Sequence, residues 1–198
     1  MKKLMLTASA IAMAAVLAGG SAKAEDDVTA WRLFVSDHAE PVVNVIDALD
    51  GDKLASFKVK GPASLYRSES GETVYAVQGA DGTVSAISSG ISFHDHGDHA
   101  DIDIDDAKLL DVSLTGTKPA HFVERQGNIA QWFDGEDQAR FFTEKAVEDG
   151  KLDVKTASVG AAHHGVAVPY DKYAVVTIPN PDDASKRPIG ARIVDFDG

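Results

Sequence analysis

Three of the seven histidines in the chain lie close together, in the stretch FHDHGDHADIDIDD at positions 94, 96 and 99. His94 and His96 share one face of an extended segment and His99 lies on the other, but a turn at Gly97 could gather all three. Neutral imidazole is a common zinc ligand, and three or four ligands make a site. Asp98 could bind the ion as well or orient a histidine. The stretch therefore predicts a zinc site, with a metal-free polar loop as the open alternative.

The same residues fit the pattern H-x-H-x-D-H, the metal motif of the metallo-β-lactamase-fold hydrolases. Those enzymes hold one or two zinc ions that generate hydroxide from water. Their motif lies between a strand and a helix, whereas here the acidic run 100–106 follows it. Because aspartate and isoleucine alternate in that run, it predicts a strand with one face in water. A zinc hydrolase is therefore the alternative function.

Two more histidines, His121 and His163, occupy matching places in a repeat. Three four-residue segments can be superimposed: 61–64 (GPAS), 118–121 (KPAH) and 160–163 (GAAH). Each follows one β-like stretch and opens another, as expected for the ~40–50-residue repeat of a β-propeller. Equivalent positions on the innermost strands face the central channel, so His121 and His163 are predicted to share a metal ion there. His164 would point away if its strand is regular, and an ordinary core or rim histidine remains the alternative for each.

The rest of the chain alternates short β-like stretches with turn signals. The predicted strands are 31–36, 42–46, 54–59, 73–77 and 83–87, separated by Asp-Gly or Ser-Gly pairs. Only 137–147 could form a helix. We therefore expect an all-β fold, a β-propeller of four-stranded blades, with the His/Asp stretch inserted into one blade.

The end of the chain repeats an earlier segment. Residues 193–198 (IVDFDG) match 45–51 (VIDALDG), where a further strand follows the Asp-Gly turn. We therefore expect the chain to be an N-terminal portion of about four blades of a longer protein. A complete small β-sandwich is the alternative.

The first 24 residues have the pattern of a secretory signal peptide. Two lysines precede an apolar run over 4–17 that is too short to span a membrane, and Ala-Lys-Ala at 22–24 suits signal peptidase. A mature domain over 25–198 is expected in the periplasm, without a membrane anchor.

The composition restricts both the partners and the ligands. The chain has 19 basic and 31 acidic residues, and removal of residues 1–24 takes away three lysines and no acid. Such a negative surface excludes nucleic acid as a partner and attracts cations. Because the chain has no cysteine, a metal site must use imidazole and carboxylate, which suits zinc.

Four segments together resemble the AztD-type periplasmic zinc metallochaperones: TAWRLFVSDHAEPVVNVIDALDG, GPASLYRS, HDHGDHADIDI and KPAHFVERQG. The resemblance covers the whole mature chain, although members of that family are longer. It implies a β-propeller that binds Zn2+ without catalysis and passes it to the solute-binding protein of a zinc ABC importer. It also implies that the ligands come from the histidine-bearing segments: His94, His96, His99, His121 and His163. One group would form a tight, partly open site and the other a loop that captures zinc.

Overall fold

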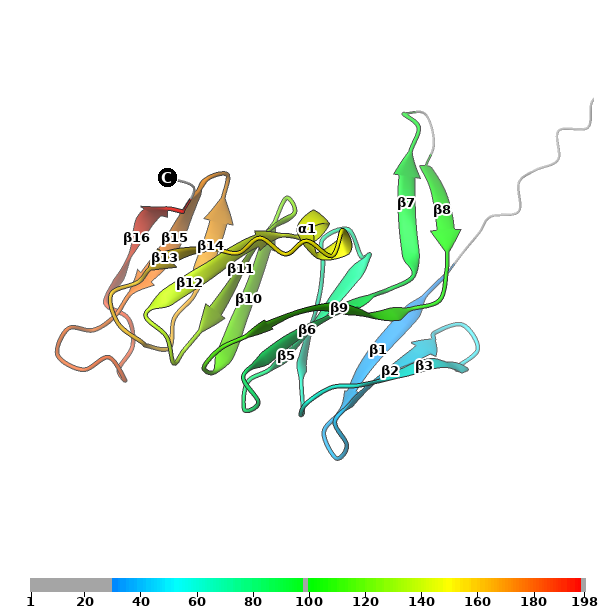
Figure 1. The fold of residues 1–198 in the computed structure, drawn as a ribbon, viewed down its shortest axis with the longest axis horizontal. Helices are drawn as coiled ribbons and strands as arrows, with labels where there is room; N and C mark the ends of the chain where they lie inside the picture. Colours follow the sequence, from blue (N-terminus) through cyan, green and yellow to red (C-terminus); the bar gives the residue numbers. More distant parts are fainter. Residues whose placement is uncertain (1–29, 98–99, 197–198) are drawn as a thin grey trace, which may run out of the picture.

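The computed structural model describes residues 30–97 and 100–196, which are almost entirely antiparallel β-structure (Figure 1). The predicted signal peptide, residues 1–24, lies outside the described residues, as do Asp98 and His99. No helix in the described part of the chain is long or apolar enough to cross a membrane.

Four antiparallel sheets follow one another along the chain (Figure 1). The first contains β1 (Arg32–Asp37), β2 (Val42–Asp47) and β3 (Lys53–Lys58). The second contains β4 (Ser64–Arg67), β5 (Thr73–Gln78), β6 (Thr83–Ser88) and β9 (Lys108–Thr115). The third contains β10 (Pro119–Arg125), β11 (Asn128–Phe133), β12 (Gln138–Thr143) and β13 (Lys155–Ser158). The fourth contains β14 (Ala167–Tyr170), β15 (Tyr173–Ile178) and β16 (Gly190–Asp195).

The connections between the sheets are those of propeller blades. The last strand of each sheet leads to the first strand of the next, and β10 lies against β14, whereas the end of β1 meets the start of β4. In a β-propeller the first strands of the blades line a central channel. The predicted all-β propeller is confirmed, and the chain contributes four blades to it, of which the first and fourth have three strands each in the described residues.

The local sequence explains the strand positions. All five stretches predicted as strands fall within one or two residues of β1, β2, β3, β5 and β6. The glycines of the predicted turn signals, Gly51, Gly71 and Gly82, all have positive φ values, between 64° and 85°. Glycine adopts this conformation without steric cost, so each pair ends one strand and starts the next.

A separate apolar cluster fills each of the three spaces between neighbouring blades. Val43 and Ile87 join the first and second blades, Tyr75 and Phe122 join the second and third, and Trp132 with its neighbours joins the third and fourth. Burial of these side chains fixes the angle between blades, so residues at the ends of inner strands are held in place.

The helix predicted over 137–147 is wrong for its first half. Residues 138–143 form β12, in which the buried Ala139 and Phe141 alternate with partly exposed Gln138 and Arg140. That period of two belongs to a strand. Only α1 (Glu144–Glu148) is helical, and the hydroxyl of Thr143 caps it by accepting from the Ala146 N–H.

The His/Asp stretch forms a hairpin between β6 and β9, as the predicted insertion requires. Its strands are β7 (Ile91–Asp95) and β8 (Ala100–Ile104), which pair with each other in a two-stranded sheet and project from the second blade (Figure 1). The strand predicted for the alternating Asp-Ile run is therefore confirmed. At its base, the Arg32 guanidinium donates to the carbonyls of Ser89 and Asp105, which ties the hairpin to β1.

Candidate metal site

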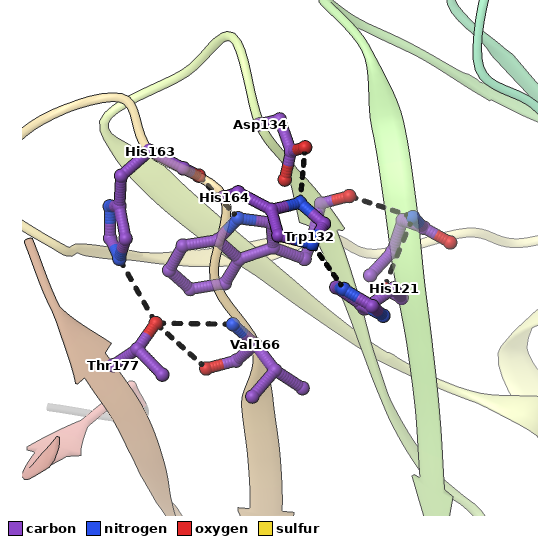
Figure 2. Close-up of polar contacts among 8 residues, drawn as sticks. His121, Trp132, Asp134, His163, His164, Val166 and Thr177 are labelled. Atoms are coloured by element: carbon purple, nitrogen blue, oxygen red, sulfur yellow. Dashed lines mark hydrogen bonds and ion pairs between the residues drawn. The ribbon is translucent and has the colours of Figure 1, made fainter. Parts of the chain in front are cut away.

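Two exposed histidines from neighbouring blades face each other at the start of the inner strands. His121 lies on β10, and His164 lies in the loop that leads from β13 to β14. Their Nε2 atoms are 3.3 Å apart (Figure 2). Two imidazole nitrogens that bind one tetrahedral zinc at ~2.0–2.1 Å stand about 3.3 Å from each other. The pair is therefore already spaced for a shared ion.

Asp134, just after β11, sets the orientation of the His164 ring. Its Oδ2 atom lies 2.7 Å from His164 Nδ1 (Figure 2). If Nδ1–H donates to this carboxylate, Nε2 carries the lone pair and points it at His121, as in a carboxylate–histidine–metal arrangement. The His164 side chain is 69% exposed and that of Asp134 only 23%. The His164 side chain is thus largely exposed, whereas the carboxylate that orients it is mostly buried.

His163 has a different environment from its neighbour. It is 3% exposed, with Nδ1 2.7 Å from the Ala161 carbonyl and Nε2 3.0 Å from the Thr177 hydroxyl. Its ring meets Trp132 edge-on, with ring centroids 4.9 Å apart (Figure 2). The ligand role predicted for His163 stays a prediction, and it would require one of these two hydrogen bonds to break.

The expectation that His164 points away is wrong, because it assumed a regular strand from residue 163. β14 begins only at Ala167, so His163 and His164 lie in a loop where strand alternation does not apply. Asp134 is a site residue that the sequence did not predict. The Phe-Asp-Gly turn at 133–135 marks the end of a strand, but it does not reveal which loop of the next blade the carboxylate reaches.

The histidines of the hairpin pair with aspartates of β8 instead of with each other. His94 Nε2 lies 3.1 Å from Asp103 Oδ2, and His96 Nε2 lies 3.2 Å from Asp101 Oδ2. All four side chains are more than half exposed. Within residues 30–97 and 100–196, no group of three or more His, Asp or Glu side chains is arranged to hold a metal. A zinc site here, including Asp98 and His99, stays a prediction.

The hydrolase alternative gains no support from this arrangement. The H-x-H-x-D-H stretch lies on a two-stranded hairpin and is followed by β8 and β9, so the described residues after it provide none of the strand-to-helix context of that motif. The hairpin offers two exposed imidazole–carboxylate pairs, which can attract a cation but do not enclose one.

A second polar cluster lies between the second and third blades and includes Glu124, which lies on the same strand as His121. The Glu69 N–H donates to Oε2 of Glu124, and the Ser70 hydroxyl donates to Oε1 of Glu144. Oε1 of Glu124 is buried and has no hydrogen-bond partner among the described residues. Burial and the neighbouring Glu144 carboxylate raise the pKa of Glu124 from 4.5 to about 7. A proton on Glu124 that is shared with Glu144 would satisfy the buried oxygen.

The chain matches no protein-family model. It is 66% identical over 198 residues to the zinc chaperone AztD of Citrobacter koseri. The aligned region covers 100% of this chain and 47% of that protein. The crystal structure of Citrobacter koseri AztD superimposes with a TM-score of 0.84 and 71% identity, covering 85% of this chain and 45% of that chain. The structure of apo AztD from Citrobacter koseri superimposes with a TM-score of 0.84 and 70% identity. It covers 87% of this chain and 46% of that chain. This chain therefore spans about half the length of the curated relative it matches. The relative is named a chaperone, which agrees with the prediction that the chain is not an enzyme.

Proposed function

We propose that the chain is part of an AztD-type protein, to which it is similar over its whole length, and that it carries zinc as cargo between His121 and His164. From there the ion passes to the periplasmic solute-binding protein of a zinc ABC importer. The observation that carries the proposal is the 3.3 Å separation of the two Nε2 atoms, together with the hydrogen bond from His164 Nδ1 to Asp134. The two imidazoles and the carboxylate that orients one of them are thus already close together.

The geometry accounts for binding by replacement of a proton. If a neutral His164 donates its Nδ1 proton to Asp134, the contact between the two rings requires a proton on His121 Nε2. When His121 carries its proton on Nδ1 instead, both Nε2 lone pairs face the same point, and zinc can bridge them. Zinc binds only neutral imidazole, so acidification is expected to weaken binding.

The exposure of the site accounts for release to a partner. Two imidazoles leave two positions of a tetrahedral shell open to water or to incoming ligands. A solute-binding protein with a more complete ligand set could take the ion in steps, replacing one imidazole at a time, so that free zinc is not released. The hairpin with His94 and His96 would attract the cation to the protein, although its base lies near Glu72 and the C-terminal end of β10, away from His121.

The test is a zinc titration followed by transfer to an apo zinc-binding protein with a stronger chelating site. The chain is expected to bind one zinc at this site at pH 7.5 and to transfer it, whereas His121→Ala and His164→Ala each lose at least tenfold in affinity. His38→Ala is the matched control, because His38 lies exposed in the turn after β1. Equal affinity of all three variants would refute the proposed site. Failure of transfer from a loaded chain would refute the carrier role alone.

A further inference from the structure

Regular secondary structure does not fix the orientation of the His164 side chain, because this residue lies in a loop. Residues 159–166 contain no regular secondary structure, and the His164 side chain is exposed. A loop side chain that is ready to bind metal must have its main chain fixed by neighbouring groups. The elements packed beneath the loop are therefore decisive for the site.

Trp132 holds the loop on the N-terminal side of His164. Its indole N–H donates to the His163 carbonyl over 3.1 Å, and its ring packs edge-on against the His163 ring (Figure 2). Trp132 is 1% exposed in the apolar cluster between the third and fourth blades. Because Trp132 and Asp134 are two residues apart, the end of β11 supplies both the anchor of the main chain and the acceptor for the His164 ring.

Thr177 holds the loop on both sides of His164. Its hydroxyl lies 3.0 Å from His163 Nε2 and accepts from the Val166 N–H over 3.1 Å (Figure 2). The Ala161 carbonyl can only accept, so Nδ1 of His163 carries the proton and Nε2 accepts from Thr177. One side chain on β15 thus connects the residues before and after the His164–Gly165 pair.

The main chain at Gly165 packs so closely against its neighbours that a larger residue would not fit. A Cβ atom at this position would lie 2.2 Å from Thr177 Oγ1 and 2.6 Å from both His163 Nε2 and Trp132 Cζ2. Only glycine allows the main chain to approach these side chains so closely. The loop is therefore seated directly on Trp132, His163 and Thr177.

We propose that Trp132 and Thr177 are positioning residues of the zinc site, which fix the main chain on both sides of His164 so that its Nε2 faces His121 before zinc arrives. This inference rests on the proposed function for the identity of the cargo. His163 connects these two residues to His164: its carbonyl accepts from Trp132 and its Nε2 bonds to Thr177. Neither Trp132 nor Thr177 touches the ion.

The experiment compares Thr177→Val, which removes the hydroxyl at nearly constant volume, with Thr177→Ser, which keeps it. Thr177→Val is expected to weaken zinc binding about tenfold, as is typical when a supporting hydrogen bond is lost, whereas Thr177→Ser stays within twofold of wild type. Thr156→Val on β13, where the threonine is exposed, controls for the substitution itself. All titrations are made well below the unfolding temperature of the least stable variant.

Nitrogen-15 NMR of the zinc-free chain supplies a readout that general destabilisation does not move. In wild type and Thr177→Ser, His164 is expected to carry its proton on Nδ1, while Thr177→Val shows exchange between the two tautomers. Equal zinc affinity and an unchanged His164 tautomer in Thr177→Val would overturn the positioning role. If wild type shows the fixed tautomer but zinc binding is insensitive to His121→Ala, the proposed function fails while the positioning of His164 stands.

Discussion

Replacing Glu124 by glutamine is expected to stabilise the chain above neutral pH and to have little effect at pH 5. Glu124 lies between the second and third blades, where burial and the Glu144 carboxylate raise its pKa to about 7. Because the folded-state pKa lies above the ordinary value of 4.5, the stabilisation from this group is complete below pH 4.5. It is lost as the pH rises through 7.

The magnitude follows from the pKa shift. A shift from 4.5 to about 7 corresponds to roughly 3 kcal/mol at ~1.36 kcal/mol per pKa unit. Glu124 is only partly buried, so solvent screening reduces this to about 1–2 kcal/mol. Glutamine keeps an oxygen that accepts from the Glu69 N–H and places an amide N–H toward Glu144. The variant should therefore gain about 1–2 kcal/mol at pH 8.

The assay is urea unfolding of wild type and Glu124→Gln between pH 5 and pH 8, followed by tryptophan fluorescence. Wild type is expected to lose stability as the pH rises through 7, whereas the variant shows a flatter profile. Glu40→Gln is the control, since Glu40 is exposed in the turn before β2 and its loss should leave the profile unchanged. A Glu124→Gln variant that is less stable than wild type at pH 8 would refute the shared-proton interpretation.

Three further substitutions test separate contacts. Gly90→Ala should destabilise the hairpin base by about 1–3 kcal/mol, because φ is +70° and a Cβ would lie against the Asp105 carbonyl. Thermal unfolding measures this change, and an unchanged melting temperature would contradict the packing there. The double variant His94→Ala/His96→Ala removes only exposed ion pairs, so the free energy of unfolding should change by less than about 1 kcal/mol. Zinc uptake measured by stopped flow is expected to become slower, and uptake at the wild-type rate would exclude a capture role. Asp134→Asn should weaken zinc binding about tenfold in chelator competition because the negative acceptor for His164 is lost, and wild-type affinity in this variant would show that the carboxylate does not support the site.

The fold follows largely from local signals in the sequence. Period-two stretches ended by glycines with positive φ, such as Gly51 and Gly82, specify strands and turns through short-range sterics. The repeat at 61–64 and 118–121 correctly marks the starts of the inner strands β4 and β10. The segment 137–147 was misassigned because pairing with β11 and β13 outweighs the helical preference of its first half.

The site follows from the sequence only in part. The repeat correctly assigns His121 to an inner strand, but it places the third unit on His163 as though a strand began there. The direction of His164 depends on the indole N–H of Trp132 and the hydroxyl of Thr177, which are distant in sequence and belong to two different blades. Local pattern carries no information about such contacts, because packing between blades decides which of two adjacent histidines is buried.

Anomalous diffraction at the zinc absorption edge, recorded on crystals of the zinc-loaded chain, tests the central claim most directly. One ion is expected between His121 and His164, with Nε2 of each at ~2.0–2.1 Å and Asp134 still bonded to His164 Nδ1. Zinc bound by His163, or found on the hairpin with the space between His121 and His164 empty, would contradict it.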